Sequence, residues 1–303
     1  MAEQTIGVIA GRSISVGLVA GHELAAPLRT WPPPGFEAEA GEATDIHGLP
    51  VQAIADKIAD SVRDLCDEQQ ASPRAVGAGV PGIVRAGVIE DSPNLKQAKG
   101  ARMAEMLAAA LAARGLRIPV YLFNDADVTA AGIAATKGQL ERLVRVWTLG
   151  HGIGFGRYPH GDGVWEGGHM VVTLDTKETY CGCGGRGHLE GIMGHRAMRL
   201  RFMDMEPEEV FAAAAQGDAR CAEFELLWHR ALAAATAGVI HVGGPGKFFI
   251  SGMNSRFVKV GLLNQYLHEM VTMSPLEGSV FEVVPTDERI AVVGAAVNAS
   301  RAA

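Results

Sequence analysis

The feature that most constrains the fold is a pattern that occurs twice: a strand-like run, a glycine-containing turn and a second strand-like run. It opens the chain as TIGVIAG and SISVGLVAG, at residues 5–11 and 13–21, and returns as VRVWTLGHGIGFGRY at residues 144–158. Each copy is followed by mixed helical and strand patterns. With 303 residues, the chain is long enough for two domains of about 150 residues each. The sequence therefore predicts two related α/β domains facing each other across a cleft.

Periodicity and turn residues predict the elements between and after these hairpins. Helices are expected over residues 49–69, 103–115, 222–242 and 290–303. Strands are expected within residues 75–84, ending at Pro81-Gly82, and over residues 120–125, 247–252 and 279–286. Residues 30–48, with three consecutive prolines, are expected to form a loop.

Composition and charge narrow the classes of function. The formal net charge is −7 with histidines neutral, and no segment is strongly basic. Because binding to nucleic-acid phosphates needs clustered lysines and arginines, we expect no nucleic-acid partner. The first residues, MAEQTIGVIAG, lack the regions of a signal peptide, and no apolar run reaches the roughly 18–20 residues that span a bilayer. We expect a soluble, cytoplasmic protein with no membrane partner.

The cysteines are too few for a disulfide framework. The chain has four, and Cys66 and Cys221 fall in helical patterns, where we expect buried core thiols. Cys181 and Cys183 are close together, in the glycine-rich segment CGCGGRGHLE.

This cysteine segment has the residue types of a metal site. Cys181 and Cys183 can both reach one ion, and His188 follows across a glycine-rich turn. Zinc favours four nitrogen or sulfur ligands in a structural site, and the nearest upstream candidate for the fourth is His169, in EGGHMVV. A surface loop with incidental thiols and a redox pair are the alternatives, although redox pairs usually have C-x-x-C spacing. The residues alone favour a Cys2His2 zinc site.

The segments EGGH and CGCGGRGHLE closely resemble the zinc-motif signature of the ROK family of repressors, open reading frames and sugar kinases: E-x-G-H, then C-x-C-G-x-x-G-C-x-E. FNDADVTAAG resembles the family's N-D-A-N-A-A-A-x-G segment, and LGHGIGFG its G-T-G-I-G-x-G phosphate loop. VPGIV with SPNL resembles the sugar-loop segment, FFISG the strand and turn on the adenosine side, and VVGAAVNAS the terminal helix. Order and spacing agree over nearly the whole chain.

The resemblance implies an actin-like, hexokinase-type fold, in which two RNase H-like domains flank a cleft that holds a sugar and a nucleotide. It implies a smaller domain at residues 1–124 plus about 288–303, and a larger domain with the zinc motif at 125–287. Family repressors carry a helix-turn-helix segment before this core. Because the first strand is predicted to begin at about residue 5, we expect the kinase branch. Family members are commonly dimers or tetramers, so a homodimer or homotetramer is expected.

The same resemblance assigns roles at the end of the strand VYLFND. Asp125 matches the family's catalytic aspartate, the base near the attacking sugar hydroxyl. Asn124 would hydrogen-bond a sugar hydroxyl. From the residues alone, Asp125 could instead cap the helix that follows.

Further sugar-binding residues follow from the resemblance. Glu166 and Glu190 match two carboxylates that accept hydrogen bonds from sugar hydroxyls. His169 matches the position where one ring nitrogen binds zinc and the other contacts the sugar, so the zinc would shape the sugar pocket. Gly82 and Asn94 are further candidates for lining it, although Asn94 could be only a turn residue.

The sequence departs from the family at the zinc motif and at the first phosphate loop. His188 stands where the family usually has a third cysteine, and histidine is also a zinc ligand. In the first phosphate loop, D-x-G-G-T, Gly11 is kept. Ile9 stands at the Asp, Arg12 at a Gly and Ser13 at the Thr. A magnesium ion bridging phosphates would lack one expected partner there.

The second phosphate loop departs at one position. His151 replaces the Thr of G-T-G, while Gly150 and Gly152 remain, so backbone N–H groups could still hold phosphate. Gly252, in FFISG, is expected on the nucleotide side. Arg12 and His151 could replace cationic charge carried by the metal.

These observations predict a sugar kinase that phosphorylates a hexose or N-acylhexosamine hydroxyl, using ATP with Mg2+ and a structural Zn2+. Two alternatives remain open. One is a catalytically silent sugar-binding or regulatory protein with degraded phosphate loops. The other is a kinase that uses a phosphoryl donor other than ATP.

Overall fold

The computed structural model describes residues 3–33, 45–161 and 163–303. The chain divides into two units. The first comprises Met1–Val144, Gly156–Val164 and Asp287–Ala303, and the second comprises Arg145–Phe155 and Trp165–Thr286.

The first unit is built on a mixed sheet with strand order β3-β2-β1-β5-β8, in which β4 also pairs with β2. β1 pairs antiparallel with β2 and parallel with β5, and β5 pairs parallel with β8. The strands of this unit are β1 (Gln4–Ala10), β2 (Ile14–Ala20), β3 (Glu23–Leu24), β4 (Arg29–Trp31), β5 (Val76–Val80), the hairpin β6 (Ile83–Arg85) and β7 (Val88–Asp91), and β8 (Val120–Asn124). Its helices are α1 (Val51–Gln69), α2 (Met103–Ala113), α3 (Asp125–Thr136) and α9 (Glu288–Ala302), with short 3-10 turns at Ile46–Gly48 and Lys96–Ala98.

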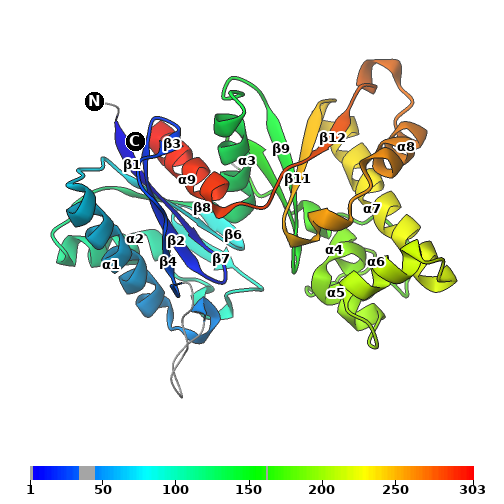
Figure 1. Cartoon of the computed structure of the whole chain (residues 1–303), viewed down its shortest axis with the longest axis horizontal. Helices are drawn as coiled ribbons and strands as arrows, with labels where there is room; N and C mark the ends of the chain where they lie inside the picture. The colour runs from blue at the N-terminus through cyan, green and yellow to red at the C-terminus, as the bar shows by residue number, and fades with distance from the viewer. Residues whose placement is uncertain (1–2, 34–44, 162) are drawn as a thin grey trace. The chain divides into compact units, whose positions relative to one another are not determined.

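The two faces of this sheet differ in side-chain size. Even-numbered β1 residues such as Ile6 and Val8 point into a large apolar core with α1 and α2. On the other face, Gly7 and Gly77 lie so close to α9 that an added Cβ would come within 1.9 Å and 2.0 Å of helix carbonyl oxygens. Helix α9 therefore lies almost directly on the strands, with α3 beside it (Figure 1).

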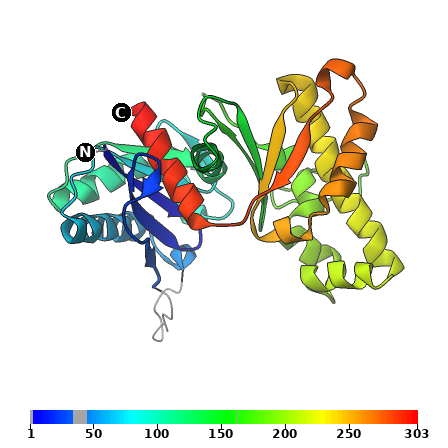
Figure 2. The same ribbon diagram turned by 45° about the horizontal axis from the view of Figure 1, so that its top comes forward.

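The last turn of α9 lies beside the beginning of β1. Thr5 and Ser300 hydrogen-bond through their hydroxyls at 2.9 Å, and Arg74 donates to the Ser300 carbonyl at 2.6 Å. Figure 2 shows the C-terminal end of α9 next to the N-terminal strand. Because these contacts hold the C-terminal end of α9 against the sheet, they also determine where the first residues of α9 lie.

The second unit is built on the sheet β10-β9-β11-β12, in which β9, β11 and β12 are parallel. Its strands are β9 (Val144–Leu149), β10 (Ile153–Tyr158), which ends in the first unit, β11 (Lys247–Ser251) and β12 (Val280–Val283). Its helices are α4 (Leu189–Met193), α5 (His195–Arg201), α6 (Pro207–Ala215), α7 (Ala219–Gly243) and α8 (Val260–Met270), with 3-10 turns η3 (Gly167–His169), η4 (Met253–Phe257) and η5 (Ser274–Leu276). Helices α7 and α8 pack side by side (Figure 2).

The core of the second unit is rich in aromatic side chains. Trp147 on β9, Trp228 on α7 and Phe248 on β11 are fully buried, and the indole N–H groups donate to Thr236 and to the Met193 carbonyl. Each apolar side chain of this size contributes roughly 1.5–3 kcal/mol or more on burial. This core supports the loops that follow β9 and β11 and the segment that leads into α4.

The structure confirms the hairpins and the other strands and helices predicted from the sequence, and Cys66 and Cys221 are buried thiols. The loop predicted for residues 30–48 is wrong at its start. There β4 pairs with β2, with Thr30 opposite Ser15, and this pairing satisfies backbone groups at the sheet edge. Residues 34–44 of that prediction lie outside the described residues. Within the described part of the chain, no helix is both long and apolar enough to cross a membrane.

Candidate active site

All four predicted metal ligands lie close together in the second unit. The ligand atoms of His169, Cys181, Cys183 and His188, the metal-ligand cluster, all lie within 4.8 Å of one another. The two cysteine sulfurs are 3.3 Å apart, and the Cys183 sulfur lies 3.2 Å from His188 Nδ1. Bonds of about 2.0–2.3 Å to a tetrahedral zinc ion would place neighbouring ligand atoms roughly 3.3–3.8 Å apart. The donor set and its spacing therefore fit zinc.

Backbone pairing brings His169 to this loop from upstream. Val171 forms a bridge with His188, and Leu189 N–H donates to the Met170 carbonyl at 2.9 Å. Gly187 allows this backbone pairing, because it has φ +68° and an added Cβ would come within 2.0 Å of the Thr173 carbonyl oxygen. The loop that gathers the ligands therefore requires glycine at position 187.

Burial controls the ionisation of two residues in the cluster. Burial is the main reason that the pKa of the Cys181 thiol rises to about 12, and the nearby Glu190 carboxylate adds to the effect. Burial, and then the neighbouring His169, lower the pKa of His188, which favours the neutral imidazole that ligates metals. A cation would supply the positive charge that a Cys181 thiolate needs.

Glu190 and Glu166 flank the cluster. The Glu190 carboxylate accepts the Ile153 N–H at 3.0 Å and lies 3.6 Å from the Cys181 sulfur, so it joins the cluster to the turn before β10. Glu166 pairs with His169 Nδ1 at 3.5 Å. The structure thus places both predicted sugar-binding carboxylates next to the metal-ligand cluster.

The predicted base lies at the carboxyl end of β8, in the first unit. Asn124 caps α3, accepting the Ala126 N–H at 2.8 Å, and its amide donates to the Gly82 carbonyl at 2.9 Å. Asp125 is half-buried in the first turn of α3, and one of its oxygens also accepts the Ala126 N–H, at 2.9 Å. Asn124 is therefore the cap, and the Asp125 carboxylate is held at the edge where β5 and β8 both end.

Gly82 and Asn94 differ in how closely they are tied to this edge. Gly82 follows β5 with φ +109°, and an added Cβ would lie 2.3 Å from the Asp91 carbonyl oxygen, so only glycine fits. Asn94 is exposed in the turn after β7, where Ser92 accepts the Leu95 N–H at 3.1 Å. The structure brings Gly82, Asn124 and Asp125 together by direct contacts and leaves Asn94 on the surface.

The second glycine turn, residues 150–152, joins β9 to β10 in the second unit. Its Gly150 carbonyl accepts the backbone N–H of His195 at 3.0 Å and the side-chain amide of Asn254 at 3.2 Å. Gly152 lies against Glu190, whose carboxylate an added Cβ would approach within 2.4 Å. At the end of β11, Gly252 has φ +98° and abuts the Leu149 backbone. The turn is thus held by α5, η4 and Glu190.

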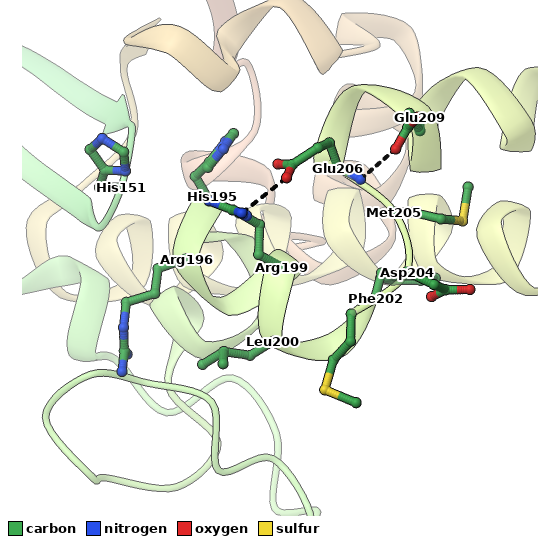
Figure 3. A pocket seen from close by; sticks show the side chains of 11 residues that line it. His151, His195, Arg196, Arg199, Leu200, Phe202, Asp204, Met205, Glu206 and Glu209 are labelled. Carbon is green, nitrogen blue, oxygen red and sulfur yellow. Dashed lines mark hydrogen bonds and ion pairs between the residues drawn. The ribbon is translucent and has the colours of Figure 1, made fainter.

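A pocket of 780 Å³ opens beside this turn, between α5 and the beginning of α6 (Figure 3). The His151 and His195 rings stand edge to face with centroids 5.7 Å apart, and Arg199 pairs with Glu206 at 3.0 Å. The lining residues are His151, His195, Arg196, Arg199, Leu200, Phe202, Met203, Asp204, Met205, Glu206 and Glu209. The lining carries both signs of charge: Arg196 and the paired Arg199 stand with the carboxylates of Asp204, Glu206 and Glu209, and Leu200, Phe202, Met203 and Met205 add apolar surface.

The first glycine turn, residues 11–13, joins β1 to β2 in the first unit. Gly11 N–H donates to the Ser13 carbonyl at 3.0 Å, and Arg12 pairs with Asp45 at 3.5 Å. Burial acts to raise the pKa of Asp45, but hydrogen bonds from His47 and Arg12 outweigh it and hold the pKa below its usual value. Ile9 packs against a small apolar cluster that includes Val128 of α3. Ile9 therefore contributes packing at the position where the family's motif has an aspartate.

The structure adds residues that the sequence analysis missed. Asn254 is fully buried and joins His195 to the second glycine turn, accepting from His195 Nδ1 at 3.2 Å. Asp127 is also buried; it accepts the Arg157 N–H at 3.0 Å and lies 3.4 Å from His160 Nδ1. A signal existed for Asp127, which stands at the second Asn of the N-D-A-N motif. The role of Asn254 depends on contacts distant in sequence.

Comparisons with known proteins agree with this geometry. A family model described as the ROK family matches residues 37–301. A glucokinase from Thermotoga maritima is 30% identical over 276 residues, covering 79% of this chain and 83% of that protein. A glucokinase from Pyrobaculum calidifontis is 29% identical over 193 residues, covering 59% of this chain and 62% of that protein, less than two thirds of its length.

Solved structures agree on the fold. The ROK hexokinase from Thermus thermophilus matches with a TM-score of 0.77 and 22% identity, over 99% of this chain and 98% of that one. The chain therefore has the expected actin-like ATPase fold. Both of these curated relatives are glucokinases. On the family model and these relatives, the chain belongs to the ROK family.

Proposed function

We propose that this chain transfers a phosphoryl group from a nucleoside triphosphate to a hydroxyl of a hexose or N-acylhexosamine. The observation that carries the proposal is the fixed carboxylate of Asp125 at the end of β8, beside an Asn124 that is itself tied to Gly82. A base for this reaction has to be held in one place before the substrate arrives.

In the proposed reaction, Asp125 accepts the proton of the attacking hydroxyl. The hydroxyl oxygen forms a bond to the γ-phosphorus, and the bond from that phosphorus to the β–γ bridging oxygen breaks. The products are the sugar phosphate and the nucleoside diphosphate. Positioning and charge stabilisation account for most of the catalysis of phosphoryl transfer, so a fixed Asp125 would be one contributor among several.

The donor is proposed to lie along the second glycine turn. Backbone N–H groups of such turns hold phosphate oxygens, and Arg196 lines the adjoining pocket. His151 also lines this pocket, where its ring nitrogens could hydrogen-bond a phosphate chain. Mg2+ bound with the nucleotide would neutralise the charge that develops on the phosphates.

Zinc is the metal we propose for His169, Cys181, Cys183 and His188. Four protein ligands close the coordination sphere, so its role would be to hold the loop in place and not to activate water. His169 and Glu190 belong to this loop or contact it. The proposed zinc would therefore fix the side chains that accept and orient sugar hydroxyls, together with Glu166.

Steady-state kinetics with ATP, Mg2+ and a panel of hexoses and N-acetylhexosamines test the proposal. Asp125→Asn should lower kcat by about 10²–10⁴-fold with a much smaller change in sugar KM, because the base is lost while the shape is kept. Asp67→Asn, on the exposed surface of α1, is the matched control and should leave kcat unchanged. Equal kcat values for Asp125→Asn and the wild type would contradict the assignment.

A second candidate is a sugar-binding protein without phosphotransfer. The observation that favours it is the apolar packing of Ile9 at the first glycine turn. Such a protein would show no turnover with any donor, while sugar would still raise its Tm.

The homodimer or homotetramer expected from the family stays a prediction. Light scattering across a range of protein concentrations would measure the assembly's mass.

A further inference from the structure

Glu288, in the first turn of α9, meets the first glycine turn within the first unit. Ser13 Oγ donates to Glu288 Oε1 at 3.2 Å, and Ser15 Oγ donates to Glu288 Oε2. Ser15 is fully buried, whereas Glu288 is exposed. Both oxygens of one carboxylate are therefore held at the turn between β1 and β2, and the carboxylate remains accessible to solvent.

The strand register places this carboxylate next to Ile9. Ile9 and Ser15 are directly opposite each other in the antiparallel pair β1–β2. Opposite residues point to the same face of a sheet, so Ile9 and the Ser15 hydroxyl share a face. It is the face that α9 covers, because Gly7 and Gly17, two residues away on each strand, contact Val292 of α9. Glu288 thus places a carboxylate beside Ile9, which stands where the family motif has an aspartate.

The hydrogen bonds and charges around Glu288 leave it suited to a cation. A carboxylate has about four acceptor positions, and the two serines use two of them. The flanking charges pair with each other, Asp287 with Arg289 at 2.7 Å. Across the turn, Arg12 pairs with Asp45 at 3.5 Å. Glu288 therefore keeps acceptor capacity on its exposed side.

We propose that Glu288 supplies the carboxylate that the first glycine turn lacks at Ile9, and that it helps to hold the divalent cation of a metal–nucleotide donor. This inference rests on the proposed function. Mg2+ in such sites keeps several waters and uses one or two protein carboxylates besides the substrate phosphates, so a single exposed carboxylate backed by hydroxyls fits it. Glu288 contacts the cation or its water shell and takes no part in proton transfer.

Calorimetric binding of the imido analogue of ATP, once with Mg2+ and once with EDTA, tests the proposal without turnover. Glu288→Gln keeps the side-chain shape and removes the charge. We expect it to weaken binding by about tenfold with Mg2+ and to leave binding in EDTA unchanged. In the Ile9→Asp/Glu288→Gln double variant, the carboxylate stands at position 9 of β1 and no longer on α9. Mg2+-dependent binding should then return. Glu141→Gln, an exposed glutamate after α3, is the control and should bind like the wild type.

The outcomes separate this inference from the proposed function. Wild-type binding that depends on Mg2+ but is unchanged in Glu288→Gln would overturn the role of Glu288 and leave the kinase proposal standing. Equal weakening with Mg2+ and with EDTA would show a structural effect and would also overturn it. A wild type that binds no nucleotide under either condition would overturn both. If Ile9→Asp prevents folding, the Glu288→Gln comparison decides alone, because Glu288 is exposed and its replacement is conservative.

Discussion

The metal-ligand cluster and the first glycine turn are assembled in opposite ways. In the cluster, three ligands come from one short glycine-rich segment, and the fourth, His169, arrives on a segment that pairs with it. At the turn, the carboxylate comes from Glu288, in a helix at the other end of the chain. The cluster keeps its motif because its geometry depends on local sequence. At the first glycine turn, the carboxylate is supplied by a residue distant in sequence. A different residue can therefore supply it, and the sequence of the turn then no longer matches the family motif.

The largest effect is expected from removing a metal ligand. His188→Ala should lose the zinc, and zinc bound at a thousandfold excess over its Kd stabilises the fold by about 4 kcal/mol. Metal analysis and chemical denaturation measure the two effects, with exposed His268→Ala on α8 as the control. A wild-type protein with no zinc, or a His188→Ala variant that keeps it, would contradict the cluster.

Gly187→Ala tests whether the cluster depends on its loop backbone. The new Cβ would meet the Thr173 carbonyl and impose strain at φ +68°, at a cost of about 3 kcal/mol. Gly184→Ala is matched: it has φ +82° and no atom within 4 Å of the added Cβ, so it should cost about 1 kcal/mol. Equal costs in urea denaturation would show that the close approach of Gly187 does not matter.

The second glycine turn lies in the same unit as the metal-ligand cluster, but residues distant in sequence hold it in place. Asn254→Ala removes the amide that joins His195 to Gly150, at a cost of about 2 kcal/mol in unfolding free energy. Gln265→Ala, on the exposed side of α8, should cost less than 0.5 kcal/mol. If Asn254→Ala costs no more than this control, the turn is fixed by its backbone contacts alone.

The smallest effect is a coupling between positions 9 and 288. Ile9→Asp should destabilise the wild type more than it destabilises Glu288→Gln, because two neighbouring carboxylates repel. A double-mutant cycle of unfolding free energies should give a coupling of about 1 kcal/mol. A coupling indistinguishable from zero would mean that the two side chains are not neighbours. That would contradict the pairing of Ile9 with Ser15 and the hydrogen bond from Ser15 to Glu288.

The sequence predicted the cluster and the position of Asp125 because their signals are local. C-x-C spacing, a following histidine and several glycines are enough to propose a ligand set, and the structure brings those four ligand atoms together. The hairpins were predictable from the same kind of pattern, since alternating small and apolar residues around a glycine specify two paired strands. Helix α7, which the structure places at Ala219–Gly243, was predicted over residues 222–242.

The contributions of Glu288 and Asn254 could not be predicted in this way. Each depends on where a helix or turn is placed by a sheet: α9 by the glycines of β1 and β5, and η4 by the end of β11. The start of the loop at residues 30–48 was misassigned for a related reason. A short edge strand is defined by the neighbour it pairs with, here β2, and its own three residues carry little signal.

The most direct test of the proposed kinase activity is a phosphorus NMR assay of the wild-type protein with a hexose and four donors in turn: ATP, GTP, pyrophosphate and polyphosphate. We expect a sugar phosphate with a nucleoside triphosphate donor, formed only with Mg2+ and absent in Asp125→Asn. Sugar phosphate from none of the four donors, with a sugar that still raises the Tm, would contradict it and identify a sugar-binding protein without phosphotransfer.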